Sequence, residues 1–140
     1  MTAVRKAFGG TEVPAARSQQ QIEDLLRKHD VEAIRWTMLG ERIVLEFKLP
    51  DGSFALSVRY DVGDARTDDA RRRQVLRALA WHLKAKFDAI DFGLEDVMRA
   101  FMPYLITAPN RTLGDDVVEA VEQRRLGAEI PLLPAGSVQP

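Results

Sequence analysis

The sequence predicts an α+β fold in which helices cover one face of a three-stranded antiparallel sheet. Between residues 34 and 60, apolar side chains recur at every second position, which is the period of a β-strand. Between residues 67 and 90 they recur three and four positions apart, which is the period of a helix. The expected order is an N-terminal helix, a three-stranded antiparallel meander, a long helix packed on the sheet and two shorter C-terminal helices.

The first helix is expected to begin at Ser18, after a flexible arm over residues 1–17 that is rich in small residues. Gln21 follows Ser18 at the spacing of a capping box. One apolar stripe follows, and the helix is expected to end near His29, where a cation suits the negative end of the helix dipole. The stripe consists of Ile22, Leu25 and Leu26.

Three short alternating runs follow and predict the meander. Gly40 separates the first run from the second, and Pro50-Asp51-Gly52 forms a tight turn before the third, because proline presets φ and glycine accepts a positive φ. Each strand has one apolar and one mostly polar face, so the sheet should be covered on one side only. The apolar positions are Ile34, Trp36 and Met38, then Ile43, Leu45, Phe47 and Leu49, then Phe54, Leu56, Val58 and Tyr60.

The long helix is expected from Thr67 or Asp68 to about Ile90 and should supply the cover. At 1.5 Å per residue it would be about 33 Å long. Its apolar positions are Leu76, Leu79, Leu83, Phe87 and Ile90.

Two shorter helices are expected after Gly93. The first carries Leu94 to Phe101 and should end or kink at Pro103. The second begins at a capping-box-like pair, Thr112 and Asp115, and ends before Gly127. Residues 18–127 therefore form a single α+β domain, and residues 128–140 an extended proline-rich tail. The apolar segment Ile130-Pro131-Leu132-Leu133-Pro134 could dock on its own domain or on another subunit.

Composition restricts the class of protein. With 46% hydrophobic and 29% charged residues, the chain has the balance of an ordinary globular domain. The absence of cysteine excludes disulfides and thiolate chemistry and favours a cytoplasmic protein. No apolar stretch approaches the ~18 residues of a membrane span. A net charge of −1 argues against bulk electrostatic coating of nucleic acid but leaves a local basic face open.

No residue pattern indicates catalysis, a metal or another cofactor. His29 and His82 are far apart, and neither has a second histidine or a carboxylate at metal-ligand spacing. Glycine-rich phosphate loops and a nucleophile beside a base are also missing. The acidic pairs at 68–69, 95–96 and 115–116 each begin an expected helix, where the helix dipole favours negative charge. A non-enzymatic protein is therefore expected.

The long helix carries the strongest indication of function. Arg73, Arg77, Trp81 and Lys84 are spaced so that they form one stripe, and Arg71, Arg72 and Lys86 extend the positive charge. Guanidinium groups suit a phosphate backbone, and an aromatic ring among them can stack on a base. The alternative is a solvated face whose arginine stems cover apolar surface, with Trp81 half-buried. Arg35 and Arg59, on the exposed face of the sheet, could join either surface.

Several short motifs resemble a small uncharacterised family of phage and mobile-element proteins. They are Val13-Pro14, Ser18, Ile22 and Leu25-Leu26 near the start, Lys84-Ala85-Lys86-Phe87 in the long helix, and Leu132-Leu133-Pro134 near the end. The similarity extends over most of the chain. The family has no assigned activity, so the resemblance implies a phage or mobile-element origin and no site residues.

Two broader analogies point towards nucleic acid. The order helix, three antiparallel strands, helix is that of double-stranded-RNA-binding domains, although the turn at Gly40 lacks the proline and histidine of their minor-groove loop. The segment from Lys48 to Tyr60 is similar to the hairpin of phage single-strand annealing proteins.

The resulting hypothesis is a non-enzymatic accessory protein of a phage or mobile element that binds nucleic acid, DNA or RNA, through its basic helix as an oligomer. The alternative is a decoy or inhibitor that captures a host-defence protein or a signalling nucleotide.

Overall fold

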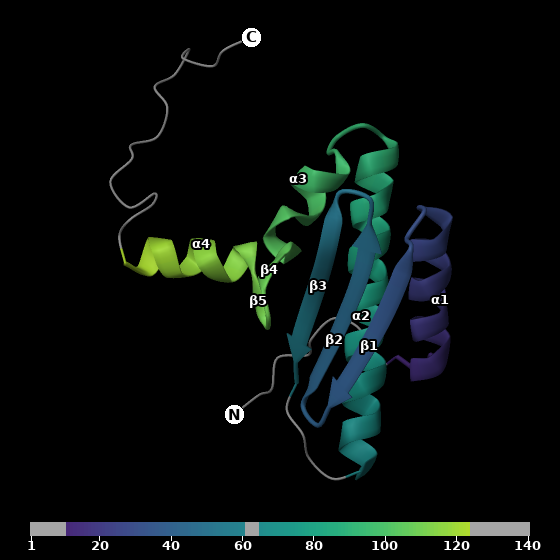
Figure 1. The fold of residues 1–140 in the computed structure, drawn as a ribbon. Coiled ribbons are helices and arrows are strands. Elements are labelled where there is room, and N and C mark those ends of the chain that lie inside the picture. The colour runs from purple at the N-terminus through teal and green to yellow at the C-terminus, as the bar shows by residue number, and fades with distance from the viewer. Residues whose placement is uncertain (1–10, 61–64, 124–140) are drawn as a thin grey trace, which may run out of the picture.

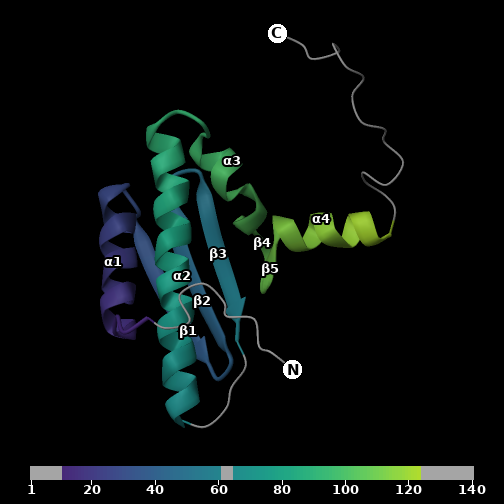
Figure 2. The same ribbon diagram turned by 180° about the vertical axis from the view of Figure 1, so that it is seen from behind.

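The computed structural model describes residues 11–60 and 65–123 and shows an α+β fold (Figure 1). Three antiparallel strands in the order β1-β2-β3 form the sheet, and two helices, α1 and α2, lie side by side on one face of it (Figure 2). The expected α+β arrangement is therefore confirmed. The elements are α1 (Ala15–Lys28), β1 (Ala33–Leu39), β2 (Arg42–Leu49), β3 (Gly52–Arg59), α2 (Ala65–Asp91), α3 (Val97–Phe101), η1 (Met102–Tyr104), β4 (Ile106–Ala108), β5 (Arg111–Thr112) and α4 (Leu113–Glu122).

The prediction that α1 begins with a capping box at Ser18 is wrong. The helix begins at Ala15, inside the expected arm, and Pro14 precedes it with a carbonyl that accepts the N–H groups of Arg17 and Ser18. Ser18 lies one and two helical turns before Ile22 and Leu26, on the same buried face, and is fully buried itself. Its hydroxyl therefore faces the core and does not cap the helix.

The apolar face of each strand is the one that alternation predicts. Ile34 pairs with Phe47 and Phe47 with Phe54, so these apolar side chains share the face that α1 and α2 cover. The two turns also lie where expected, since Gly40 and Gly52 have positive φ values of 51° and 154°. Both are conformations that favour glycine.

Four phenylalanines form the centre of the core. Phe101 has its ring centroid 5.2 Å from that of Phe87, 5.4 Å from that of Phe47 and 6.0 Å from that of Phe54. All four are almost fully buried, so α3 closes one end of the layer between sheet and long helix. Offset and edge-on ring contacts of this kind stabilise beyond their buried area. The expected core positions of α2 are buried, and Ile90 is partly buried at the edge of the core.

The region after α2 differs in detail from the expectation. α3 begins only at Val97, capped by Asp96, and leaves Leu94 exposed. Pro103 ends it in a short 3-10 turn. A hairpin, β4 and β5, then precedes α4 and was not predicted; Leu105 bridges it to Phe54 of β3. The capping box at Thr112 and Asp115 is confirmed at the start of α4.

α4 differs from the other long helices in having no buried residue. It packs mainly against η1 and β5 at its first turn and projects beyond the edge of β3, away from α1 and α2 (Figures 1 and 2). The expected tail and the last part of the expected second short helix lie outside the described residues.

Candidate nucleic-acid interface

A groove of about 380 Å³ runs between α1 and α2 on the side of the helices that faces away from the sheet. Both helices pack closely along their length, because their apolar stripes share one core. The polar groups at the rim of the groove come from the helix positions next to those apolar stripes. The groove is lined by Gln21, Leu25, Lys28 and His29 of α1 and by Arg77, Ala80, Trp81, Lys84, Asp88 and Asp91 of α2.

Arg77 and Trp81 form the middle of this groove. The Arg77 guanidinium lies 5.8 Å from the centre of the Trp81 ring and donates a hydrogen bond to the side-chain oxygen of Gln21. A cation within about 6 Å of an aromatic ring is attracted to its face. Gln21 therefore fixes the guanidinium from α1, while Trp81 keeps half of its surface exposed, at 50%. The arrangement presents a cation and an exposed indole together.

Lys84 continues the stripe one turn further along α2. Its ammonium lies 3.0 Å from Asp88, and both side chains are more than half exposed, at 57% and 51%. An exposed pair at this helical spacing contributes only about 0.3–0.5 kcal/mol. A phosphate oxygen could therefore replace Asp88 as the partner of Lys84 at little energetic cost.

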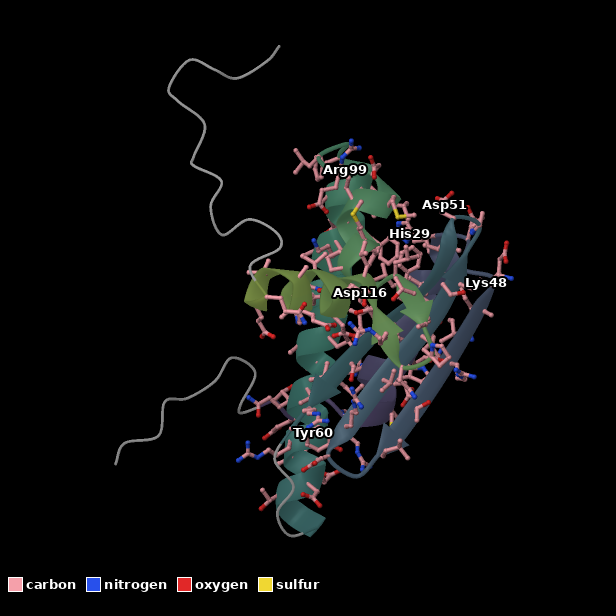
Figure 3. The ribbon with its side chains drawn as sticks, turned by 60° about the vertical axis from the view of Figure 1, so that its left-hand side comes forward. His29, Lys48, Asp51, Tyr60, Arg99 and Asp116 are labelled. Atoms are coloured by element: carbon pink, nitrogen blue, oxygen red, sulfur yellow. The ribbon has the colours of Figure 1, made fainter. Side chains whose placement is uncertain are left out.

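His29 forms one end of the groove and has a packing role. Its ring stacks on Phe87 with centroids 4.2 Å apart, and Nδ1 lies 2.9 Å from the Leu25 carbonyl oxygen. Nε2 lies 3.3 Å from a carboxylate oxygen of Asp91. Figure 3 labels His29 near the end of α1. Asp88 and Asp91 add negative charge at this end of the groove, and the positive charge of the groove comes from Arg77 and Lys84 of α2 and Lys28 of α1.

The three consecutive arginines of α2, of which Arg73 begins the expected stripe, do not share one face. Successive residues lie about 100° apart around a helix, so Arg71, Arg72 and Arg73 point in three directions. Arg73 is on the side of Arg77 and pairs with Asp69. The Nε atom of Arg72 is buried and finds no hydrogen-bond partner among the described residues. Arg71 is half-buried and has an interaction of its own.

The remaining expected cations lie elsewhere on the molecule. Lys86 is on the opposite flank of α2, with its ammonium 3.6 Å from Glu95. Arg35 and Arg59 lie on the sheet face away from the helices, because Arg35 is in register with Glu46 and Arg59 with Arg42. Arg35 pairs with Glu46, and this hydrogen bond raises the pKa of Arg35 above its ordinary value. Neither sheet arginine can contribute to the groove.

Sequence reasoning missed the contribution of α1. Gln21, Leu25 and Lys28 lie at successive turns of α1, and this spacing places them on one side of the helix. The spacing was readable in the sequence, but which neighbour this side faces depends on how α1 and α2 pack. The structure therefore narrows the expected stripe to Arg77, Trp81 and Lys84, with Arg73 at its start, and adds Gln21 and Lys28.

The side chains that line the groove could make two kinds of contact with a ligand. The indole of Trp81 can stack on a flat ring, and the cations around it can contact phosphates. Within residues 11–60 and 65–123, no group of three or more histidine or acidic side chains could hold a metal ion, and no helix is long and apolar enough to cross a membrane. Comparison with known proteins finds no matching family model, no matching curated protein and no matching solved structure.

Proposed function

We propose that this protein binds single-stranded nucleic acid in the groove between α1 and α2, as a non-enzymatic, cytoplasmic accessory protein of a phage or mobile element. The observation that carries the proposal is the half-exposed Trp81 with the Arg77 guanidinium held 5.8 Å from its centre. An exposed aromatic ring among cations is the arrangement on which unpaired bases stack while their phosphates are neutralised.

A single strand fits better than a duplex. Bases in a duplex are already stacked on each other, so an indole on a helix surface cannot reach their faces. From Arg77 to Lys84 the helix rises about 10 Å, which makes the cationic track short. Asp88 and Asp91 end it on one side. We therefore expect a site of a few nucleotides that tolerates many sequences, because every base has a face to stack.

The cations of the groove set the expected salt dependence. Three of them, Lys28, Arg77 and Lys84, can each meet one phosphate. For single strands the logarithm of the binding constant falls with the logarithm of salt by about 0.7 per neutralised phosphate, which gives a slope of about −2. This slope is small, in keeping with a net charge of −1.

The decoy hypothesis has one observation in its favour. A groove of about 380 Å³ with an aromatic ring and three cations could also take a mononucleotide, because ligand sites of this size commonly hold small molecules. Competition with free nucleotides separates the two functions. A mononucleotide that displaces an oligonucleotide at a similar concentration would favour nucleotide capture, whereas displacement only by longer strands would favour nucleic-acid binding.

The proposal is tested by fluorescence anisotropy with labelled oligo(dT) and oligo(U) of 12 nucleotides. We expect Trp81→Ala to weaken binding by about 1–3 kcal/mol, the usual contribution of one stacked base. Arg77→Ala and Lys84→Ala should each lower the salt slope by about 0.7. Thermal unfolding followed by circular dichroism will show that these exposed substitutions leave the fold intact.

Lys86→Ala provides the matched control. It removes the same charge from the same helix as Lys84→Ala, but Lys86 pairs with Glu95 on the opposite flank. We expect its affinity and salt slope to equal those of the unmodified protein. The proposal fails if Trp81→Ala and Lys84→Ala bind as well as the unmodified protein, or if Lys86→Ala weakens binding as much as Lys84→Ala.

A further inference from the structure

The sheet has a second face that no described helix covers. Because α1 and α2 both lie on the other side, the side chains on this face are exposed or only half-buried. Its middle carries small or short side chains, including Val44, Ala55 and Ser57. Its charged residues are four bases and one acid: Arg35, Arg42, Lys48 and Arg59 against Glu46. We call this surface the open face.

α4 has the opposite character. Between Leu113 and Glu122 it contains four acidic residues and no basic one. The three valines of α4, Val117, Val118 and Val121, are 41%, 56% and 46% exposed. An isolated helix of ten residues is marginal in water, and helices in proteins gain their stability mainly from packing an apolar face. α4 shows such a face to solvent. The four acids are Asp115, Asp116, Glu119 and Glu122.

The direction of α4 is fixed at its first turn. Asp116, which Figure 3 labels, accepts hydrogen bonds from Thr107, at 2.9 Å, and from Arg111, at 2.8 Å. Gly114 lies so close to Pro103 that a Cβ there would come within 2.8 Å of the proline carbonyl oxygen. These contacts hold the helix beyond the edge of β3 (Figure 1), where it forms the wall of a corner and leaves its floor, the open face, uncovered.

We propose that α4 of one copy packs on the open face of a second copy, and that the exchange is reciprocal. The valines would cover the small side chains in the middle of the face, and the acids would meet its surrounding bases. A helix on a sheet is a common layer arrangement, and here it would give the sheet its second layer.

A second copy suits these surfaces because each copy carries both halves of the complementary pair. A twofold axis beyond the edge of β3 would bring each α4 over the open face of the other copy, so that the same contact forms twice. The doubled contact brings the interface towards the roughly 1,600 Å² typical of stable complexes. The charges also oppose each other. Arg111 pairs with Asp116 and Glu119, which leaves α4 and Arg111 together with a surplus of three acids against a surplus of three bases on the face.

The first test uses two charge-reversed variants of the full chain. One reverses the helix (Glu119→Lys with Glu122→Lys), which leaves Asp116 to hold Arg111. The other reverses the open face (Arg42→Glu with Arg59→Glu). Light scattering after size exclusion should give a dimer for the unmodified protein and a monomer for each variant alone. An equimolar mixture should give a dimer again, because each helix then meets a face of opposite charge.

The second test removes the apolar part of the contact. Val118→Ser with Val121→Ser should raise the dimer dissociation constant at least about tenfold, measured by analytical ultracentrifugation. Phe92→Ser with Leu94→Ser is the control, since these side chains are 84% and 80% exposed but lie outside α4. This variant should dimerise as the unmodified protein does.

Three results would overturn the proposal. The unmodified protein could remain a monomer at high concentration, in which case residues 124–140 or a different protein would cover α4. The face-reversed variant could still dimerise alone, which would indicate helix-to-helix pairing. The mixture of reversed variants could remain monomeric, which would show that charge does not match helix to face.

Discussion

The two faces of the central sheet are built differently. On the covered face, α1, α2 and α3 bury a continuous core centred on Phe47, Phe54, Phe87 and Phe101. On the open face, small side chains among bases meet no helix, and α4 projects beside them without a buried residue. The covered face of the sheet is therefore fully packed within one chain. The open face and α4 are complementary in charge but do not pack on each other within the chain.

The difference separates the two proposals. The proposed nucleic-acid groove lies on the outer side of the two helices that pack on this core, and Gln21 holds the Arg77 guanidinium beside the Trp81 indole. The open face and α4 are available for association because nothing in the fold depends on covering them.

Truncating the core should have the largest effect. Phe101→Ala removes a fully buried ring that contacts three other phenylalanines and should lower the free energy of unfolding by about 3–5 kcal/mol. Truncation of an exposed side chain of α4, Val121→Ala, should change the free energy of unfolding by less than about 0.5 kcal/mol. Urea unfolding followed by circular dichroism measures both. Equal effects would mean that α4 belongs to the same cooperative core.

Gly114→Ala should displace α4 without unfolding the sheet. The added methyl group would lie 2.8 Å from the backbone oxygen of Pro103, which cannot move aside as a flexible side chain could. Overpacking of this kind costs about 1–3 kcal/mol. Hydrogen exchange should accelerate in α4 and in the hairpin, and remain slow in α2. Unchanged protection in α4 would show that the helix is not anchored at Pro103.

Loss of the helix cap should have a smaller, local effect. The Thr112 hydroxyl accepts the N–H of Asp115, and the Asp115 side chain accepts the N–H of Thr112. Thr112→Ala should destabilise α4 by about 0.5–2 kcal/mol, read from the exchange of its first-turn amides. Thr112→Ser keeps the hydroxyl and should recover most of the loss. If the serine variant exchanges as fast as the alanine variant, the cap is not responsible.

Lowering the pH should slightly weaken the contacts that Asp116 makes with Arg111 and Thr107. Hydrogen bonds from Arg111 and Thr107 hold the pKa of Asp116 below its ordinary value. A carboxyl with a lowered pKa stabilises the structure fully above its ordinary pKa, about 3.9, and loses this contribution as the pH falls below it. The contact between the hairpin and α4, followed by NMR of the Arg111 side chain, should therefore weaken below about pH 4. Asp116→Asn should remove this pH dependence; an unchanged profile would assign it to another group.

The sequence predicted the sheet and the long helix because both have enough residues to show a period. Alternation over Arg42–Leu49 and Gly52–Arg59 sets the buried face, and the tight turn between them fixes the register. The hairpin was missed because strands of three and two residues are too short for any period. The start of α1 was misplaced because Ser18 looks like a cap in sequence, whereas the preceding Pro14 begins the helix.

The candidate site was predictable only in part. The spacing of Arg77, Trp81 and Lys84 placed them on one stripe, and the structure keeps them together. Arg71 and Arg72 could not join that stripe with Arg73, because neighbouring helical residues point in different directions. Gln21 and Lys28 could not be found, since their position depends on packing between α1 and α2. Local periodicity predicts the faces of an element, and tertiary packing decides which faces meet.

The fluorescence of Trp81 tests the central claim most directly. A Trp36→Phe variant leaves Trp81 as the sole indole, and a Trp81→Phe variant leaves Trp36, which is half-buried and hydrogen-bonded to Glu23. Titration of the first with oligo(dT) should quench its emission in a saturable, salt-dependent way, because a base stacks on the exposed ring. The second should show no change. Quenching of Trp36 alone, or of neither indole while the strand binds, would contradict binding in the groove between α1 and α2.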